Sequence, residues 1–352
     1  MPDWSSSMTR TFEYYIVDPF TWTDKEKIEN VKSSKITRND DTETLESATI
    51  NVVDLLGECY IRIYLITIQN GVKEKHPLGT FLVQTPTSSY DGKARSVTMD
   101  AYSPLLELKE TPPPLGYSLL KGDKIMENAY RIIREKARAP VIKTDTADVL
   151  YGDFVANTDD KWLSYVSDLV ANAKYKLGLD EMGRILFLPE QDTASLQPVW
   201  TYNDDNSSIL LPDMDMDHDL YGIPNVVEVV YSSEHDIYYS RVVNDDSNSP
   251  TSTVNRGREI VYRVTDPDMI GDPTGKQIDL YAEKLLKELS SLEYTVTYTH
   301  GYCPVRIGDC VRLNYTRSGL KDVKAKVISQ TIDCKSDCLV TEKAVFTKKL
   351  WR

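Results

Sequence analysis

The chain has 352 residues, of which 41 are Lys or Arg and 54 are Asp or Glu, so its formal net charge at pH 7 is −13. This surplus of carboxylates disfavours a general surface for binding nucleic acid phosphates. Hydrophobic residues make up 41% and charged residues 27% of the chain, a balance that indicates a folded globular protein and argues against extensive disorder.

Residues 1–110 are predicted to form an antiparallel β-barrel or sandwich. From Tyr60 to Ile68, aliphatic side chains alternate with Arg62 and two tyrosines, and this period of two predicts a strand with one packed side. Asn70-Gly71 and Asp91-Gly92 are typical hairpin turns. The excess of Tyr (22) over Phe (6) and Trp (5) also favours strands with a half-exposed face. The predicted strands are 12–17, 35–38, 48–53, 60–68, 81–85 and 95–101.

Residues 111–222 are predicted to form an inserted α+β domain. It begins at three consecutive prolines, 112–114, which interrupt any β-ladder. Apolar residues recur at helical spacing over 125–137 and again over 158–178, where two aspartates favour the helix start and a glycine its end. Short strands around 185–188 and 199–202 are expected to give these helices a surface on which to pack.

Residues 223–352 are predicted to form a second β-barrel domain with one helix. Residues 244–250 are expected to be a turn-rich loop with nothing to bury. The predicted fold class is therefore α+β and mainly β, with two antiparallel β-barrel domains and an inserted mixed α/β region. The expected elements are strands at 226–231, 237–243 and 259–264, a helix at 278–292, and strands at 294–299, 310–316, 324–332 and 339–347.

One segment resembles a phosphate-binding loop at the start of the last helix. A P-loop has four residues between its glycines and a Ser or Thr hydroxyl after its lysine. Here only three residues separate Gly271 from Gly275, and Gln277 stands where the hydroxyl should be. We therefore interpret 271–277 as a turn and a helix start.

A run of alternating carboxylates precedes the strand at Val226 and leaves two interpretations open. Such a run is suited to calcium, but His218 and Pro224 occupy the places of the Gly and the Glu that an EF-hand loop requires. A solvated acidic linker is the interpretation that we favour. The four carboxylates are Asp213, Asp215, Asp217 and Asp219.

The other reactive residue types form no recognisable site, so we assign no catalytic, cofactor-binding or metal-binding residue and expect no cofactor. Cys334 and Cys338 have the spacing of a zinc-binding pair, but Cys303 and Cys310 do not, and cysteine in strands packs as a small hydrophobe. The four histidines stand in unrelated contexts, and the basic residues over 121–138 are interleaved with acidic ones, as on a solvated helix face. With Cys59, the cysteines number five, which indicates reduced thiols.

The sequence carries no segment typical of a membrane span or a secretion signal. The longest apolar run, 59–68, is interrupted by Arg62 and Thr67 and is too short to cross a bilayer. The first residues lack the basic start and apolar core of a signal peptide. We therefore expect synthesis in a cytoplasm and no stable membrane insertion.

The order of these segments resembles a phage tail hub protein, the trimeric ring at the baseplate or tail tip. The stretches that carry the resemblance are the opening barrel through 48–52 to 96–106, the helical insertion, the return to β-structure over 219–231, and the late helix followed by 304–313. The last of these contains a Gly-Asp turn that leads into a strand.

The resemblance implies that both barrels have the tail-tube fold and that three chains place six barrels in a ring. Such a ring matches a hexameric tube on one side and a threefold spike on the other. It also implies a virion protein at the tail tip or baseplate, made in the cytoplasm of a host bacterium, whose acidic lumen lets DNA pass without specific binding. The implied partners are two further copies of the chain, the tail tube protein, distal tail or baseplate proteins, and a spike or tail fibre.

Two other classes of function stay as alternatives. A carbohydrate-binding adhesin module of a tail tip needs an aromatic-lined groove, which tyrosine-rich strands permit. The other is a cell-wall hydrolase component. Because the last predicted strand ends close to Arg352, where many similar hubs continue into a hydrolase, we expect no enzyme activity.

Overall fold

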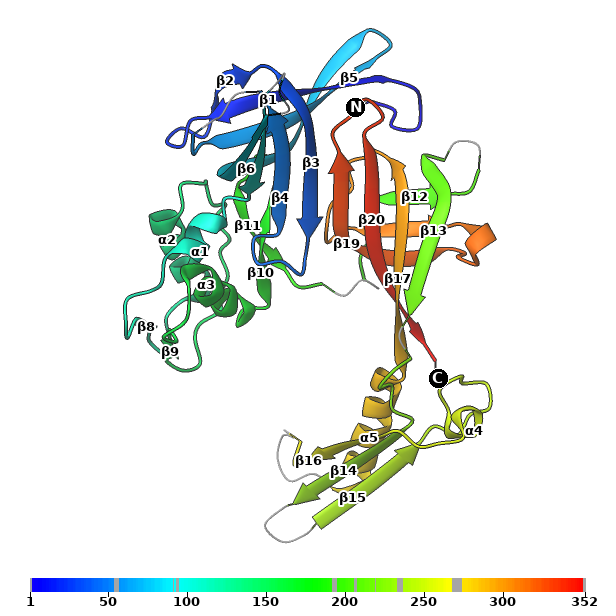
Figure 1. The fold of residues 1–352 in the computed structure, drawn as a ribbon. Helices are drawn as coiled ribbons and strands as arrows, with labels where there is room; N and C mark the ends of the chain where they lie inside the picture. The colour runs from blue at the N-terminus through cyan, green and yellow to red at the C-terminus, as the bar shows by residue number, and fades with distance from the viewer. Residues whose placement is uncertain are drawn as a thin grey trace. The chain divides into compact units, whose positions relative to one another are not determined.

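The computed structural model describes residues 2–53, 57–90, 92, 95–191, 195–205, 208–218, 220–232, 237–267 and 274–350. Within these residues the fold is mainly β with mostly antiparallel pairing, which confirms the predicted fold class (Figure 1). The chain divides into two compact units. Unit 1 is Met1–Met214 with Tyr298–Ala344, and unit 2 is Asp215–Thr297 with Val345–Arg352. No helix among the described residues has both the length and the hydropathy of a membrane span.

Seven antiparallel strands form the first strand group of unit 1, in the order β3-β4-β7-β6-β5-β1-β2. The sequence pattern predicts six of them and misses β2, whose central residues are exposed and charged, because an edge strand needs no continuous apolar face. The Asn70-Gly71 hairpin is confirmed, with positive φ at both residues, 49° and 79°. Asp91 lies outside the described residues. The strands are β1 (Thr9–Val17), β2 (Asp24–Ile28), β3 (Val31–Asn39), β4 (Glu46–Val52), β5 (Tyr60–Gln69), β6 (Val72–Tyr90) and β7 (Arg95–Tyr102).

Strand β5 contradicts the prediction of one packed side, because every residue from Tyr60 to Thr67 is buried. The arginine of this strand, Arg62, is only 1% exposed. Its Nη1 lies 2.8 Å from the Asp24 carboxylate, and its Nε donates to Thr80 Oγ1 at 2.8 Å. A carboxylate partner and hydrogen bonds thus offset the cost of burying this charge.

The second strand group has the order β13-β17-β20-β19-β18, and β12 pairs in parallel with β18. The prediction that 199–202 belongs to the insertion is therefore wrong: Tyr202 is buried opposite Leu313 of β18. Residues 329–333 of β19 pair with 35–39 of β3, so both groups form one continuous sheet. The elements are β12 (Trp200–Asn203), β13 (Leu210–His218), β17 (Ser291–Gly301), β18 (Cys310–Asn314), η1 (Thr316–Ser318), β19 (Val323–Asp333) and β20 (Leu339–Lys349).

Among its described residues the insertion holds helices α2 and α3 and the antiparallel pairs β8–β9 and β10–β11, and helix α1 immediately precedes it. Helix α2 confirms the predicted helix at 125–137, and the apolar stripe within it is buried. The second predicted helix, 158–178, is shorter, because Lys174 adopts a left-handed φ of 61° and the residues after it pair as strand β10. The elements are α1 (Leu106–Glu110), β8 (Ser118–Leu119), α2 (Ile125–Lys136), β9 (Phe154–Val155), α3 (Trp162–Ala171), β10 (Tyr175–Leu179) and β11 (Ile185–Pro189).

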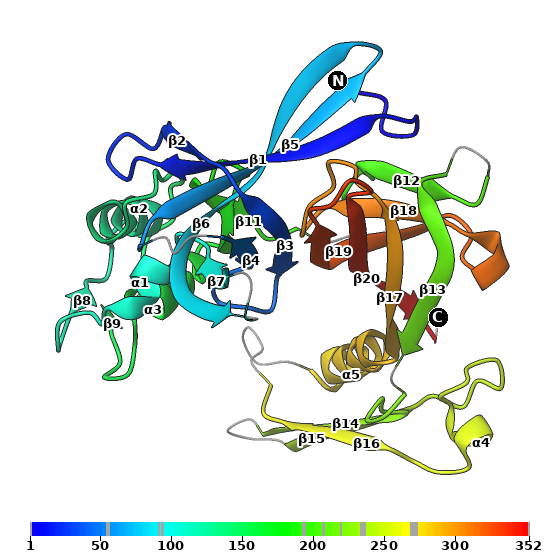
Figure 2. The same cartoon turned by 45° about the horizontal axis from the view of Figure 1, so that its top comes forward.

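Unit 2 contains a three-stranded sheet in the order β15-β14-β16, with helix α5 packed on one face (Figure 2). The prediction that residues 244–250 bury nothing is wrong. Asn244 and Ser249 have no exposed surface, and Asn244 Nδ2 donates to Ser249 Oγ at 3.0 Å. Polar side chains pack without apolar neighbours where they satisfy one another's hydrogen bonds. The elements are β14 (Val226–Ser232), β15 (Ile237–Val243), α4 (Thr253–Arg256), β16 (Val261–Thr265) and α5 (Gly275–Leu289).

The predicted segments 1–110, 111–222 and 223–352 do not coincide with the two compact units. Strands β14 and β15 and helix α5 share a core in unit 2, whereas β18 and β19 lie in unit 1. The core of the insertion is also continuous with side chains of the first strand group, among them Trp22 and Tyr60. The three-domain division stays a prediction about how the chain folds.

Candidate functional site

The segment that resembles a P-loop begins outside the described residues, which exclude 271–273. The residues that follow form a capping box at the start of α5, in which Thr274 N donates to Gln277 Oε1 at 2.8 Å. Because this box satisfies backbone donors of the first turn, it confirms the interpretation as a helix start.

The acidic run lies in a β-strand, so the prediction of a linker is wrong, although its described carboxylates are solvated as predicted. Asp213, Asp215 and Asp217 are exposed on one face of β13, while Met214 and Met216 are half-buried on the other; Asp219 lies outside the described residues. The alternation satisfies the period of two that a strand with one packed face requires. Within the described part of the chain, no group of three or more His, Cys, Asp or Glu side chains is placed to hold a metal ion.

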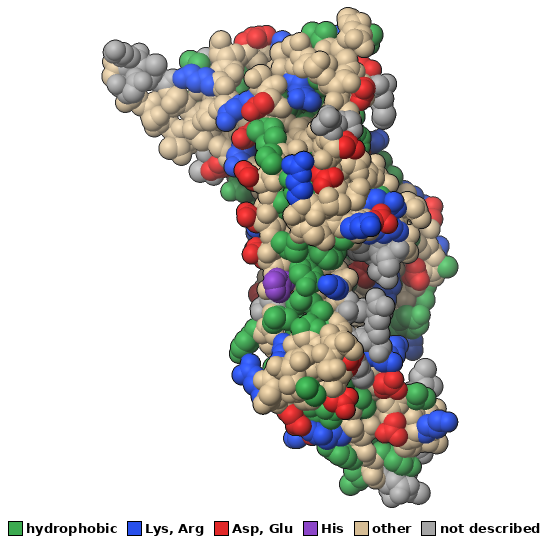
Figure 3. Space-filling model, turned by 90° about the vertical axis from the view of Figure 1, so that its right-hand side faces the viewer, with side chains coloured by type: hydrophobic (Ala, Val, Ile, Leu, Met, Phe, Trp, Pro, Cys, Tyr) green, Lys and Arg blue, Asp and Glu red, His purple; other side chains and the backbone are tan. Residues whose placement is uncertain are grey.

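Charged side chains of both signs are interspersed on the molecular face drawn in Figure 3. In the insertion, Lys124 lies 3.4 Å from Glu127, and Arg131 lies 3.8 Å from Glu135. This agrees with the interpretation of 121–138 as a solvated helix face rather than a stripe for nucleic acid.

The cysteines pack in the protein interior. Cys303, Cys310, Cys334 and Cys338 are buried, and Cys59 is half-buried. Burial raises the pKa of Cys334 to about 12, so its thiol stays protonated at neutral pH. The interpretation of these residues as small hydrophobes is confirmed for the four buried ones.

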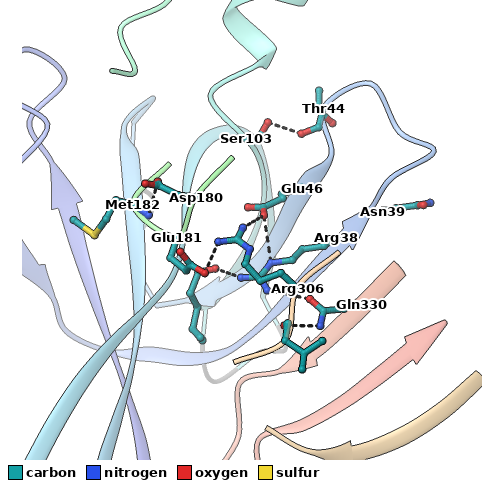
Figure 4. Close-up of polar contacts among 12 residues, drawn as sticks. Arg38, Asn39, Thr44, Glu46, Ser103, Asp180, Glu181, Met182, Arg306 and Gln330 are labelled. Atoms are coloured by element: carbon teal, nitrogen blue, oxygen red, sulfur yellow. Dashed lines mark hydrogen bonds and ion pairs between the residues drawn. The ribbon is translucent and has the colours of Figure 1, made fainter. Parts of the chain in front are cut away.

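Charged side chains from distant parts of unit 1 meet in a largely buried cluster, with Glu181 at its exposed edge (Figure 4). Arg38 lies in β3, Glu46 in β4, Arg306 in the loop before β18, and Glu181 in the β10–β11 turn. Glu46 Oε1 lies 3.3 Å from Arg38 Nε and accepts a hydrogen bond from Arg306 Nη2 at 2.7 Å. Arg306 Nη1 lies 2.5 Å from Glu181 Oε1. Arg306 therefore joins a carboxylate of the first strand group to a carboxylate of the insertion.

Gln330 of β19 connects this cluster to a second ion pair. Its amide oxygen accepts from Arg38 Nη1 at 3.1 Å, and its amide nitrogen donates to Glu342 Oε1 at 2.5 Å. Glu342 Oε1 lies 3.3 Å from His300 Nε2, and both side chains are fully buried. We call the connected set the buried joint. Its residues are Arg38, Glu46, Glu181, His300, Arg306, Gln330 and Glu342.

The buried joint is electrically balanced, with three cationic side chains and three carboxylates. Burial alone would lower the pKa of His300, but the Glu342 carboxylate and the hydrogen bonds around the ring raise it to about 10. Burial alone would raise the pKa of Glu342, but His300 and the hydrogen bonds from Gln330 and Tyr298 hold it below its usual range. Removing the charge of either His300 or Glu342 would leave its partner buried and without a counter-charge, which is costly.

The geometry of the buried joint is suited to holding parts of unit 1 together rather than to binding a substrate. The cavity that adjoins Glu46 and Arg306 has a volume of about 40 Å³, room for a few water molecules and too small for a substrate. The joint takes residues from β3, β4, β17, β19, β20 and the insertion, so its ion pairs hold both strand groups and the insertion in one arrangement.

No residue of the joint belongs to a motif that is recognisable in the sequence. A charged residue in a strand is normally expected to face solvent unless its partner is known. The alternation of inward and outward side chains along a strand is a signal that can identify such buried charges. Glu342 is in phase with Val340 and Ala344, which are buried, and is therefore an inward-facing charge.

Comparison with known proteins identifies the fold. No protein-family model and no curated protein sequence matches the chain. Among solved structures, the tail protein from Neisseria meningitidis matches with a TM-score of 0.64 at 14% identity, covering 97% of this chain and 98% of that one. The 43 kDa tail protein of prophage MuSo2 from Shewanella oneidensis matches with a TM-score of 0.62 at 10% identity, covering 95% and 98%.

A third match is a chain of the Francisella PdpA–VgrG complex. Its TM-score is 0.56 at 8% identity, and the match covers 97% of this chain but 53% of that one. At these identities the likeness is one of fold. The chain therefore has the fold of phage tail proteins over nearly its whole length.

Proposed function

We propose that this chain is the structural hub subunit of a phage tail or phage-like particle. Three copies form a ring that adapts a hexameric tail tube to a threefold tip or spike and lines the channel for DNA or effectors. The observation that carries the proposal is the fold match to two tail proteins, with TM-scores of 0.64 and 0.62 over 97% and 95% of the chain.

The construction of unit 1 supports this role. A ring of three that meets a sixfold tube needs two β-rich parts per chain, held at a constant separation. Here β3 and β19 pair directly and the buried joint adds ion pairs between the two strand groups. A subunit built in this way resists deformation when the tube presses on it.

The proposed partners are two further copies of the chain, the tail tube protein, distal tail or baseplate proteins, and a spike or tail fibre. The Francisella match belongs to a complex of PdpA and VgrG, which favours association with a second component. We propose that the insertion, 111–222, makes the peripheral or distal contact. The proposed location is the tail tip of the virion, after synthesis in the cytoplasm of a host bacterium.

The channel is proposed to be acidic and to have no specific affinity for DNA. The net charge of −13 and the exposed aspartates of β13 favour this. Duplex DNA mixed with the purified protein at low salt should migrate unretarded in a gel. Retardation that disappears with added salt would instead indicate a basic channel or surface.

The primary test is the solution mass of the purified chain by light scattering, with negative-stain images of the same sample. The expected result is three times the monomer mass and a ring with a central hole. A chain that stays monomeric even with its tail tube protein present would contradict the proposal. The same sample should give no clearing in a cell-wall zymogram, because the proposed role is structural.

A further inference from the structure

The turn between β10 and β11, residues 180–184, contacts both strand groups of unit 1. The Glu181 carboxylate lies 2.5 Å from Arg306 Nη1, in the loop before β18. The next residue, Met182, uses its backbone carbonyl, which accepts from Trp22 Nε1 at 2.7 Å and from Arg62 Nη2 at 3.2 Å. Glu181 therefore contacts the second strand group, and the adjacent Met182 contacts the first.

The shape of this turn is closely constrained. Asp180 Oδ1 accepts the backbone N–H groups of Met182 at 3.0 Å and of Arg184 at 2.8 Å. Gly183 has a φ of 72°, and a Cβ at this position would lie 2.7 Å from Thr80 Cβ. A turn held by its own hydrogen bonds and by close packing moves as a unit.

Trp22, which contacts the turn from the first strand group, has a strained backbone conformation. Trp22 is almost fully buried and has a left-handed φ of 57°, a conformation that is uncommon for a bulky side chain. Such a conformation persists where surrounding contacts impose it. The hydrogen bond from Trp22 to the Met182 carbonyl is one of those contacts.

We propose that the β10–β11 turn is a coupling element, through which opening of one strand group of unit 1 is transmitted to the other. Because the two contacts are made by adjacent residues of one constrained turn, loss of either gives the turn new freedom and weakens the other. A partner that moves the insertion would then loosen both strand groups together. The proposal concerns the interior of one chain and is independent of the hub function.

Hydrogen exchange of the full chain, followed by mass spectrometry, tests the coupling from each side. Trp22→Phe removes the Nε1 donor and keeps an aromatic ring beside Tyr60, whose ring centroid lies 4.8 Å away. We expect exchange of the amides in 302–309, around Arg306, to become more than about threefold faster, as for coupled rather than independent sites. Glu181→Gln keeps the side-chain size and removes the ion pair to Arg306. It should accelerate exchange over 18–24 by a similar factor.

Arg184→Gln is the matched control. It removes an ion pair of the same turn, Arg184 to Asp180 at 2.5 Å, from a side chain that is 48% exposed. It should leave exchange over 302–309 and 18–24 unchanged. If Trp22→Phe fails to fold, Glu181→Gln alone tests the coupling. The Glu181 side chain is 39% exposed, so the protein should tolerate its substitution. Acceleration confined to the side that was altered in each variant would overturn the proposal, whatever the oligomeric state.

Discussion

At the scale of single residues, the substitution Gly183→Ala tests how tightly the β10–β11 turn is packed. Its φ of 72° is unfavourable for other residues, and the added Cβ would lie 2.7 Å from Thr80 Cβ. We expect Gly183→Ala to lower the free energy of unfolding by about 3 kcal/mol, the sum of backbone strain and overpacking. Denaturant unfolding measures this loss.

Gly116 provides the control for that substitution, because its φ is 75° and nothing lies within 4 Å of the added Cβ. Gly116→Ala should therefore lose only the backbone contribution, about 1 kcal/mol. Equal losses in the two variants would show that Thr80 gives way and that the turn is loosely packed.

The ion pair between His300 and Glu342 predicts a loss of stability at alkaline pH. The folded-state pKa of His300, about 10, lies above its ordinary value of 6.5. Its contribution is therefore fully present below pH 6.5 and is lost as the pH rises through 10. Glu342, with a lowered pKa, has the opposite dependence and loses its contribution as the pH falls below its ordinary value of 4.5.

His300→Gln should remove the loss of stability between pH 6.5 and 10. It should also lower the free energy of unfolding at neutral pH by about 3 kcal/mol, because Glu342 is left without a counter-charge. Lys284→Gln, which breaks an exposed pair with Glu288 at 3.7 Å, is the control and should cost under about 1 kcal/mol. Unfolding in denaturant at several pH values measures both. Parallel profiles for the parent chain and His300→Gln would contradict the assigned pKa.

At the scale of elements, β13 shows how a strand can resemble a binding loop in sequence. Its aspartates are exposed and its methionines are turned inward, so the carboxylates point away from the sheet core along one face. We expect millimolar calcium to leave the thermal unfolding temperature unchanged, and each Asp→Asn change at 213, 215 or 217 to alter stability by less than about 0.5 kcal/mol. A rise of several degrees with calcium that the triple Asn variant abolishes would establish a calcium site.

Helices and strands were predicted well where one face meets the core and poorly where a local backbone turn intervenes. Helix α2 follows its apolar stripe, whereas the helix expected over 158–178 ends early, because Lys174 takes a left-handed conformation that periodicity does not reveal. The exposed β2 has no apolar signal at its centre and is missed. Periodicity therefore located most elements that have an apolar face, but it could not reveal where a local backbone turn ends one element and begins another.

At the scale of the whole molecule, the insertion and the first strand group share one core. Trp22, Tyr60 and Leu82 pack in the same apolar cluster as the helices α2 and α3. We therefore expect the fragment 111–222, expressed alone, to lack a cooperative thermal transition and to bind a hydrophobic dye. The fragment 1–191, which keeps both parts of the core, is the control and should unfold cooperatively. A cooperative transition in 111–222 would support the three-domain division instead.

The amino-acid sequence by itself determined most of the strands and helices, the apolar packing of the buried cysteines and the order of segments that resembles a tail hub. These follow from periodicity and residue type, which are local properties. Only the tertiary structure decided that β12 pairs with β18, that β3 meets β19, and that the seven residues of the buried joint connect. The partners of the joint lie far apart in the chain, as Arg38 and Gln330 do, and a buried charge is stable only beside its partner.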